Sequence, residues 1–297
     1  MKITIEAEDR ADKALARHFP DAGRRRLARL FDEGRVTADG RRIKKGDRVA
    51  AGDVLELASE PLSGDALRPQ PDPEAAARLE ILVERAELIV IAKPAGMPSQ
   101  PLRAGELGTA ASAIAARFPE CAALGDDPRD GGLVHRLDIG TSGALIAART
   151  AAAYRALREA FGAGLIDKQY LAITDGRPVA RSCDAPLAQR GRRAVVDHTD
   201  GLAAYTELAV ELASTSHALV RCTARTGRMH QVRAHLAFAG APITGDELYG
   251  GKRLPGLDGF FLHAARLALP ALPSIAPLTV EVPEPERFTR ARAAAGL

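Results

Sequence analysis

The stretch Gly131–Arg149, GGLVHRLDIGTSGALIAAR, decides how the rest of the chain is interpreted. Its second half, 144–148, is a short apolar run preceded by glycine, which predicts a buried strand. Asp138 comes just before this strand, in a sequence that predicts a tight loop. A charged carboxylate beside a buried strand needs a partner or a task, so Asp138 is a candidate for catalysis. The spacing leaves an alternative open, a structural aspartate that caps the turn through Thr141 and Ser142.

Length and composition narrow the class of protein. A chain of 297 residues suggests about two domains. No apolar run approaches the ~20 residues that span a bilayer, and the alternating start MKITIEA does not predict a secretory signal. Three widely separated cysteines, Cys121, Cys183 and Cys222, argue against a disulfide framework or a zinc site. We therefore expect a cytoplasmic protein with no membrane partner and no metal.

Positive charge is concentrated in one short segment. The net charge is only +3, but residues 24–48 contain ten Lys and Arg against four Asp and Glu, a local charge of +6. The remainder of the chain is therefore −3. Such localisation is typical of a phosphate-binding surface. A solvated helix face is the alternative.

The first 58 residues predict a small separate module. Alternation over 1–6 indicates a strand, and Asp9 could cap a helix through Leu15. A second helix is expected at 23–33, with an apolar face at i, i+3 and i+4. The Asp39-Gly40 pair predicts a hairpin turn, and a last strand is expected near 54–57.

This pattern, over residues 8–57, resembles the alpha-L RNA-binding fold of a small-subunit ribosomal protein. The resemblance implies an αα-hairpin domain over 1–58 that grips phosphates with little sequence readout. The basic residues expected to contact RNA are Arg24, Arg25, Arg29, Lys44 and Lys45. Residues 59–77 contain four prolines and no periodicity, which predicts a semi-rigid linker.

The remaining residues, 78–297, predict an α+β domain with a mixed, mainly antiparallel sheet and flanking helices. The expected strands are 79–83, 88–92, 144–148, 165–174, 204–212 and 218–226. The expected helices are 110–118, one from Thr150, and 229–239. Residues 178–202 are polar and rich in turn residues, so no strand is expected there.

The motif HRLDIGTSG resembles the signature of the RluA-type pseudouridine synthases. Four further motifs of that family occur in the family's order, 93–96 (KPAG) before it and 168–172 (KQYLA), 227–250 and 262–264 (LHA) after it. The resemblance implies isomerisation of uridine in RNA to its C-glycoside, with no cofactor. The expected partner is large-subunit ribosomal RNA, with transfer RNA as an alternative, and a monomer is expected.

The resemblance also implies roles for individual residues. Asp138 would be the catalytic carboxylate, and Arg228 of the Gly-Arg-x-His-Gln motif would be its ion-pair partner. Tyr170 would stack on the uracil and help to remove the C5 proton. The target base must be extruded from its stack, and Arg136 would fill the vacated space or bind phosphate.

Gln231 and Arg233 are expected to contact RNA or to support the scaffold. From the residues alone, His135 could equally be a packed turn histidine. The five-residue spacing of His230 and His235 does not fit a zinc helix.

The residues alone also leave other interpretations open. Arg228 could be a surface arginine at a helix start, although the helix dipole disfavours a cation there. Tyr170 could belong to the core, since tyrosine is common in strands. Two other classes of protein remain as rivals, a catalytically silent RNA-binding assembly factor and a nuclease.

The sequence departs from the family pattern at two places near the expected site. Ile139-Gly140 stands where many relatives have a charged pair, and the loop after 93–96 contains Gln100 and lacks the histidine of many relatives. We expect these changes to affect the choice of RNA target and to leave the catalytic acid in place.

Overall fold

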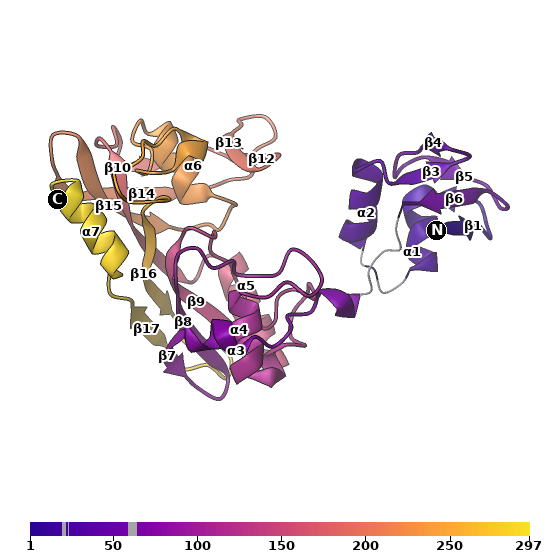
Figure 1. Ribbon diagram of the computed structural model, residues 1–297, viewed down its shortest axis with the longest axis horizontal. Helices are drawn as coiled ribbons and strands as arrows, with labels where there is room; N and C mark the ends of the chain where they lie inside the picture. The colour runs from indigo at the N-terminus through magenta and orange to yellow at the C-terminus, as the bar shows by residue number, and fades with distance from the viewer. Residues whose placement is uncertain (20–21, 23, 59–63) are drawn as a thin grey trace. The chain divides into compact units, whose positions relative to one another are not determined.

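The computed structural model describes residues 1–19, 22, 24–58 and 64–297 (Figure 1). The described chain divides into two compact units. The first comprises Met1–Arg68 and Leu102–Gly105, and the second comprises Pro69–Pro101 and Glu106–Leu297.

The linker expected at 59–77 extends too far. A short 3₁₀ helix, η2 (Gly64–Leu67), and an α-helix, α3 (Pro73–Ala77), lie within that range. Asp72 caps α3, since its Oδ1 accepts a hydrogen bond from the Ala75 N–H at 3.0 Å. A proline at the first helical position is compatible with a helix, so proline content there does not indicate a linker.

The N-terminal unit contains a four-stranded sheet in the order β1-β6-β3-β4 and two helices. Its strands are β1 (Lys2–Thr4), β2 (Asp9–Arg10), β3 (Val36–Ala38), β4 (Arg41–Arg42), β5 (Arg48–Val49) and β6 (Val54–Leu57). Its helices are α1 (Ala11–His18) and α2 (Arg24–Asp32). The expected Asp-Gly turn is confirmed, because Asp39 and Gly40 have φ values of 48° and 74°.

The apolar face predicted for the second helix is also confirmed. Leu27, Leu30 and Phe31 of α2 are buried in the core of this unit. The predicted cap of the first helix is wrong, because Asp9 instead accepts a hydrogen bond from the Arg10 N–H and pairs with Arg17. The side chains of Arg24, Arg25, Arg26 and Arg29 lie outside the described part of the structure.

The second unit is built on a nine-stranded sheet in the order β11-β14-β15-β10-β16-β9-β8-β7, with β17 also paired to β16. The strands are β7 (Glu80–Glu84), β8 (Leu88–Lys93), β9 (Ser142–Ala148), β10 (Asp167–Asp175), β11 (Ser182–Cys183), β14 (Thr206–Ala213), β15 (His217–Ala224), β16 (Leu262–Leu269) and β17 (Leu278–Glu281). The β9–β16 pair is parallel and the other pairs are antiparallel. The mixed, mainly antiparallel sheet is therefore confirmed.

A separate hairpin occupies the region where no strand was expected. It consists of β12 (Leu187–Arg190) and β13 (Arg193–Val196). Its four-residue strands carry several polar side chains, so hydrophobic periodicity gives little signal there. The helices of this unit are α4 (Ala110–Arg117), α5 (Ala151–Gly162), α6 (Gln231–Phe238) and α7 (Glu286–Ala294), with 3₁₀ turns η3 (Pro119–Cys121) and η4 (Glu247–Tyr249).

Strand β9 lies in the middle of the core. All of its seven residues are buried, which confirms the strand predicted from the apolar run. Gly143 has a φ of 117°, and a Cβ there would lie 2.2 Å from the Ala264 carbonyl oxygen. Glycine therefore permits the close parallel contact between β9 and β16.

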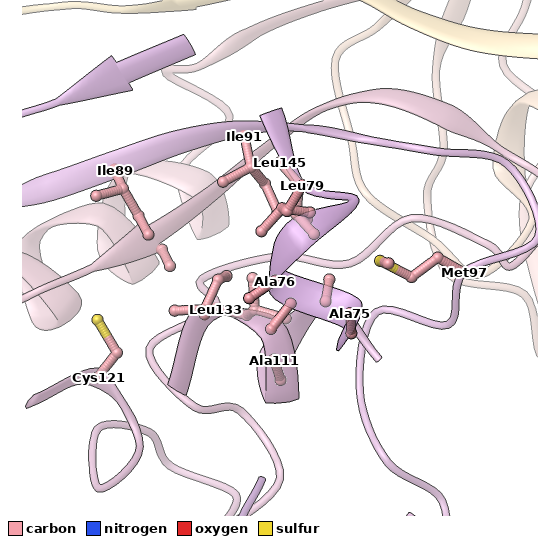
Figure 2. Packing of buried hydrophobic residues seen from close by; sticks show 14 of the residues in the cluster. Ala75, Ala76, Leu79, Ile89, Ile91, Met97, Ala111, Cys121, Leu133 and Leu145 are labelled. Atoms are coloured by element: carbon pink, nitrogen blue, oxygen red, sulfur yellow. The ribbon is translucent and has the colours of Figure 1, made fainter. Parts of the chain in front are cut away.

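The two faces of the sheet near β8 are covered by different helices. Alternate residues of a strand point to opposite faces. Ile89 and Ile91 of β8 pack with Leu145 and with alanines of α3 and α4 (Figure 2). Their neighbours Leu88 and Val90 instead pack in a cluster that includes α5. In the ranges that the structure describes, no helix is long and apolar enough to cross a membrane.

Candidate active site

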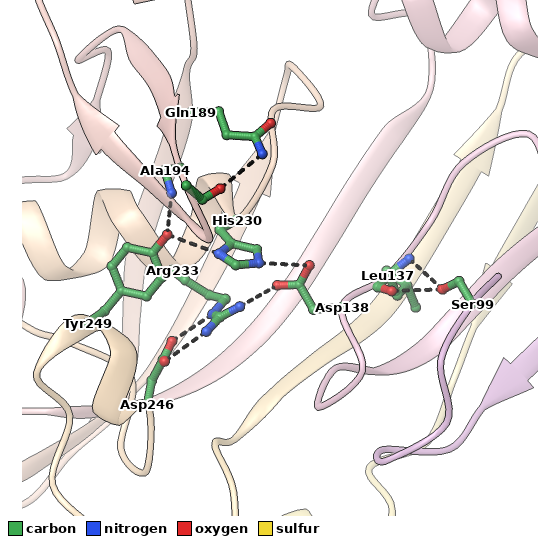
Figure 3. Close-up of polar contacts among 10 residues, drawn as sticks. Ser99, Leu137, Asp138, Gln189, Ala194, His230, Arg233, Asp246 and Tyr249 are labelled. Atoms are coloured by element: carbon green, nitrogen blue, oxygen red, sulfur yellow. Dashed lines mark hydrogen bonds and ion pairs between the residues drawn. The ribbon is translucent and has the colours of Figure 1, made fainter. Parts of the chain in front are cut away.

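The loop that carries Asp138 is fixed on its N-terminal side. Ser99 Oγ donates a hydrogen bond to the Leu137 carbonyl at 2.7 Å and accepts one from the Leu137 N–H at 3.0 Å (Figure 3). The Asp138 carbonyl accepts a hydrogen bond from the Thr141 N–H at 3.0 Å, which closes a turn. The backbone therefore holds Asp138 at the entrance to β9, as the sequence predicts.

A buried lysine fixes the same loop on its C-terminal side. Lys93 is 1% exposed, and its Nζ donates hydrogen bonds to the carbonyls of Met97, Pro94 and Ile139 at 2.8, 3.0 and 3.3 Å. The Ile139 carbonyl also accepts a hydrogen bond from the Gly96 N–H at 2.7 Å. Burial lowers the pKa of Lys93 to about 7, against the effect of the Asp138 charge. Lys93 thus joins the 94–97 loop to the loop of Asp138.

The carboxylate of Asp138 pairs with Arg233, a residue of α6. Arg233 Nη1 donates to Asp138 Oδ2 at 2.9 Å, while its Nε and Nη2 donate to the two oxygens of Asp246 at 2.7 and 2.9 Å (Figure 3). The guanidinium also lies over the rings of Phe260 and Tyr249, with centroid distances of 4.4 and 5.0 Å. Burial disfavours its charge, but hydrogen bonds and charges from Asp246 and Asp138 outweigh burial and raise the pKa of Arg233.

The predicted pairing of Arg228 with Asp138 is therefore wrong. Arg228 precedes α6, its side chain is exposed, and its Nε donates to the Ala203 carbonyl at 3.0 Å. Arg233 lies within the helix and is 6% exposed, so it reaches the carboxylate from inside the protein. In the sequence, Arg233 stands among apolar residues of a predicted helix. This position could have indicated that it is the partner of a carboxylate, because a buried arginine requires anionic partners.

Gln231 and Arg233 are both buried, which supports the expected role in the scaffold. Both also line the groove described below, so contact with RNA stays a prediction. Gln231 Oε1 accepts hydrogen bonds from the Thr226 hydroxyl and the Arg228 N–H at 2.7 and 3.1 Å. Its amide nitrogen donates to the Tyr205 carbonyl at 2.9 Å and to the Thr206 hydroxyl at 3.0 Å. Gln231 therefore belongs to the scaffold.

His230 also faces the carboxylate, a role missed in the sequence, where only a zinc site was considered for it. Its Nε2 lies 3.7 Å from Asp138 Oδ1, and its Nδ1 lies 3.0 Å from the Tyr249 hydroxyl (Figure 3). That hydroxyl accepts the Ala194 N–H at 2.8 Å, so its own proton is available to Nδ1. The ring proton then lies on Nε2, facing Asp138.

Burial lowers the pKa of His230, against the charge of Asp138 and with the charge of Arg233. The neutral imidazole is consequently favoured. Its backbone has a φ of 51°, in the left-handed region that few residues other than glycine adopt. The turn thus brings the imidazole beside the acid at some conformational cost.

The structural alternative for Asp138 is not found. Its carboxylate contacts Arg233 and His230, and among the described residues no backbone N–H of the turn donates to it. The Thr141 hydroxyl is buried without a hydrogen-bond partner in the described chain. The Ser142 hydroxyl is hydrogen-bonded to His263 Nδ1 at 2.9 Å.

Asp138 lines a groove with a volume of about 670 Å³. Tyr170 of β10 and the exposed Arg136 also line it. Burial raises the pKa of Tyr170 well above its usual range, and the nearby Asp138 charge adds to the effect. Tyr170 therefore remains a neutral phenol near pH 7, which favours stacking over action as a phenolate base.

Comparison with known proteins decides the family. A sequence model of the family described as RNA pseudouridylate synthase matches residues 87–238. A Xanthomonas campestris protein named ribosomal large subunit pseudouridine synthase D is 34% identical over 297 residues, covering 95% of this chain and 87% of the relative. This chain belongs to the RNA pseudouridine synthases.

Other relatives of the synthase agree. An uncharacterized RNA pseudouridine synthase of Chloroflexus aurantiacus is 37% identical over 272 residues, covering 89% of this chain and 83% of the relative. The solved structure of human RNA pseudouridylate synthase domain containing 4 has a TM-score of 0.60 and 25% identity, covering 75% of this chain and 95% of that chain. The family predicted from HRLD and its companion motifs is confirmed.

The structure gives a physical account of both departures from the family pattern in this synthase. A Cβ at Gly140 would lie 2.6 Å from the ring of Phe260, so the position has no room for a side chain. Gln100 donates to Asp130 Oδ1 at 2.6 Å, and Tyr154 donates to Asp130 Oδ2 at 2.8 Å. Gln100 thus secures the entrance loop. Among the residues that the structure describes, no three His, Cys, Asp or Glu side chains gather as a metal site.

Proposed function

We propose that this synthase converts uridine in RNA into pseudouridine with Asp138 as the acting carboxylate. The N1–C1′ bond breaks, the uracil turns, and C5 bonds to C1′, while the C5 proton is lost and N1 gains one. Arg233 occupies Oδ2 of Asp138 at 2.9 Å, so Oδ1 is the oxygen available to the nucleotide. This fixed carboxylate, which lines a groove, is the observation that carries the proposal.

A uridine must leave its stack to reach this carboxylate, at a cost of a few kcal/mol. The neutral ring of Tyr170 offers a stacking surface in the same groove. Arg136, exposed and two residues before Asp138, is suited to enter the space that the base vacates or to bind a phosphate.

The names of the bacterial relatives support large-subunit ribosomal RNA as the substrate, with transfer RNA as the alternative. The N-terminal unit is proposed to be an alpha-L type RNA-binding domain. Two helices, a hairpin and the exposed Lys44 and Lys45 support that role. A cytoplasmic monomer stays a prediction.

The test uses unmodified large-subunit ribosomal RNA labelled with tritium at C5 of uridine. The wild-type chain is expected to release tritium without cleaving the RNA, with or without chelator. Asp138→Asn should lower release by about 10³-fold or more, while RNA affinity stays within a few-fold. Chain cleavage would indicate a nuclease, and bound but unchanged RNA an assembly factor. Loss of binding together with release would make Asp138 a structural residue.

The role of the N-terminal unit is tested by the pair Lys44→Gln and Lys45→Gln. The plot of log affinity against log salt has a negative slope. For every phosphate that a lysine no longer neutralises, this slope should become shallower by about 0.7–0.9. The control is Lys2→Gln, which removes an exposed lysine paired with Glu56 in the same unit. Equal slopes for the wild type and the double variant would mean that these lysines do not bind RNA.

A further inference from the structure

The groove is strongly positive along its length. The described residues that line it include one acid, Asp138, and six cations, Arg136, Arg158, Lys168, Arg225, Arg228 and Arg233. Arg233 is neutralised by its two carboxylates. We call the part of the groove formed by His135, Arg158, Phe161, Lys168 and Arg225 the far end.

Lys168 is the central residue of the far end. It is 7% exposed, and its Nζ lies 5.6 Å from the centroid of the Phe161 ring. Within the described ranges, this ammonium has no hydrogen-bond acceptor. Lys93, a buried lysine of the same unit, donates to three carbonyls. The Lys168 nitrogen is not among the described side-chain nitrogens that are buried without a partner, so solvent in the groove reaches it. An anion in the groove could therefore meet an ammonium that the protein leaves unpaired.

His135 offers a second donor without an acceptor. Its ring stacks on Phe161 at 4.5 Å, and its Nε2 accepts the Ile146 N–H at 3.1 Å. Burial, followed by the charges of Lys168 and Arg158, lowers the pKa of His135 to about 3. The neutral ring therefore carries its proton on Nδ1, which no acceptor in the described part of the chain contacts.

The neighbouring charges add to the positive character of the far end. Arg225 and Arg158 also line the groove. Arg225 donates two hydrogen bonds of 3.2 and 3.3 Å to Glu207, whereas Arg158 lies 3.8 Å from the exposed Asp126. Burial lowers the pKa of Lys168, Asp167 opposes this effect, and Arg225 adds to it. A bound anion would reverse this effect by favouring the ammonium.

We propose that the far end binds a backbone phosphate of the RNA beside the target uridine, with Lys168 and His135 Nδ1–H as its donors. The inference rests on the proposed function. Lys168 and Tyr170 lie two residues apart on β10, at a spacing of about 7 Å along the strand, and both line the groove. The phosphate site therefore adjoins the ring proposed to stack on the extruded base.

The first test compares Lys168→Met with the wild type on the tritium-labelled ribosomal RNA. Affinity should fall about 10-fold, and the salt slope should decrease by about 0.7–0.9. The rate of tritium release at saturating RNA should stay within a few-fold. Lys168→Arg should restore affinity and slope, and Lys252→Met, an exposed lysine outside the groove, should change neither.

The folded state gives an independent check. Because the Lys168 ammonium has no acceptor among the described residues, replacing it by methionine should leave the unfolding temperature of the RNA-free protein unchanged or higher. A clear decrease for Lys168→Met would overturn the proposal by making Lys168 a structural residue. A fall in the saturating rate at unchanged affinity and slope would also overturn it, by assigning Lys168 to the chemical step.

The second test locates the phosphate. Once tritium release has identified the modified uridine, synthetic fragments around it can carry one neutral methylphosphonate each. One linkage next to the uridine should weaken binding to the wild type and have no further effect on Lys168→Met. Additive losses at every linkage would reject the subsite. Absence of tritium release from the wild type would instead reject the proposed function itself.

Discussion

The two ends of the groove treat buried cations in opposite ways. At the acid end, Arg233 is hydrogen-bonded to two carboxylates, and Lys93, which holds the Asp138 loop, is hydrogen-bonded to three carbonyls. At the far end, Lys168 and the Nδ1–H of His135 find no acceptor among the described residues. Arg233, which the protein pairs with its own carboxylates, stabilises the loops around Asp138. Lys168, which the protein leaves unpaired, is available to bind a ligand anion. Both ends carry positive charge, so charge alone does not distinguish them. They differ in whether each cation has a hydrogen-bond acceptor within the protein.

Among variants that keep Asp138 itself, Arg233→Met should produce the largest effect at the acid end. It leaves Asp246, 2% exposed, and Asp138 without their shared cation. Breaking a buried pair in this way typically costs about 3–5 kcal/mol of stability. Turnover should fall by about 10²–10³-fold because the carboxylate loses its orientation. Tritium release and thermal unfolding measure the two effects.

Two variants separate orientation from stability. Arg233→Lys keeps the charge but cannot bridge two carboxylates with a planar group, so its turnover should be intermediate. Asp246→Asn weakens the buried pair but leaves the Asp138 contact, so it should reduce stability more than turnover. Equal loss of turnover in Asp246→Asn and Arg233→Met would mean that Arg233 acts only through the fold.

A smaller effect is expected at the far end from His135→Gln, which keeps an acceptor for the Ile146 N–H but does not titrate. The pKa of His135 is lowered to about 3, so the unfolded chain binds the proton more readily than the folded one. Folding stability is therefore lost as pH falls from about 6.5 towards 3, by at most about 1.4 kcal/mol per pH unit.

The His135→Gln variant should lose less stability over this range, as measured by denaturant unfolding between pH 7 and 4. His198→Gln, which removes an exposed histidine, is the control. An identical pH dependence in the wild type and His135→Gln would show that the proton is not taken up at this ring.

Patterns with a local physical cause could be predicted from the sequence. The apolar run before Arg149 became the buried strand β9, and Asp39-Gly40 became a tight turn because only a few residues accept positive φ. The motif HRLD indicated the acid, and its loop position followed from the adjoining strand. The helix α3 was missed because its prolines were interpreted as a linker signal, although Pro73 begins the helix.

Pairings between distant residues could not be predicted in the same way. Arg228 and Arg233 both belong to one motif, and only the three-dimensional path of α6 decides which one reaches Asp138. His230 was considered for zinc alone, since neither its left-handed backbone nor its contact with Tyr249 has a periodic signal. The unpaired state of Lys168 likewise depends on what surrounds it in space.

The ring of Phe260 has a consequence for how this family can vary. It lies close to Gly140, and the guanidinium of Arg233 lies over it. A homologue with a larger residue at position 140 would displace this ring, and with it the contact to the arginine, unless position 260 became smaller. The residues at positions 140 and 260 should therefore covary among relatives. Their summed side-chain volume should stay nearly constant.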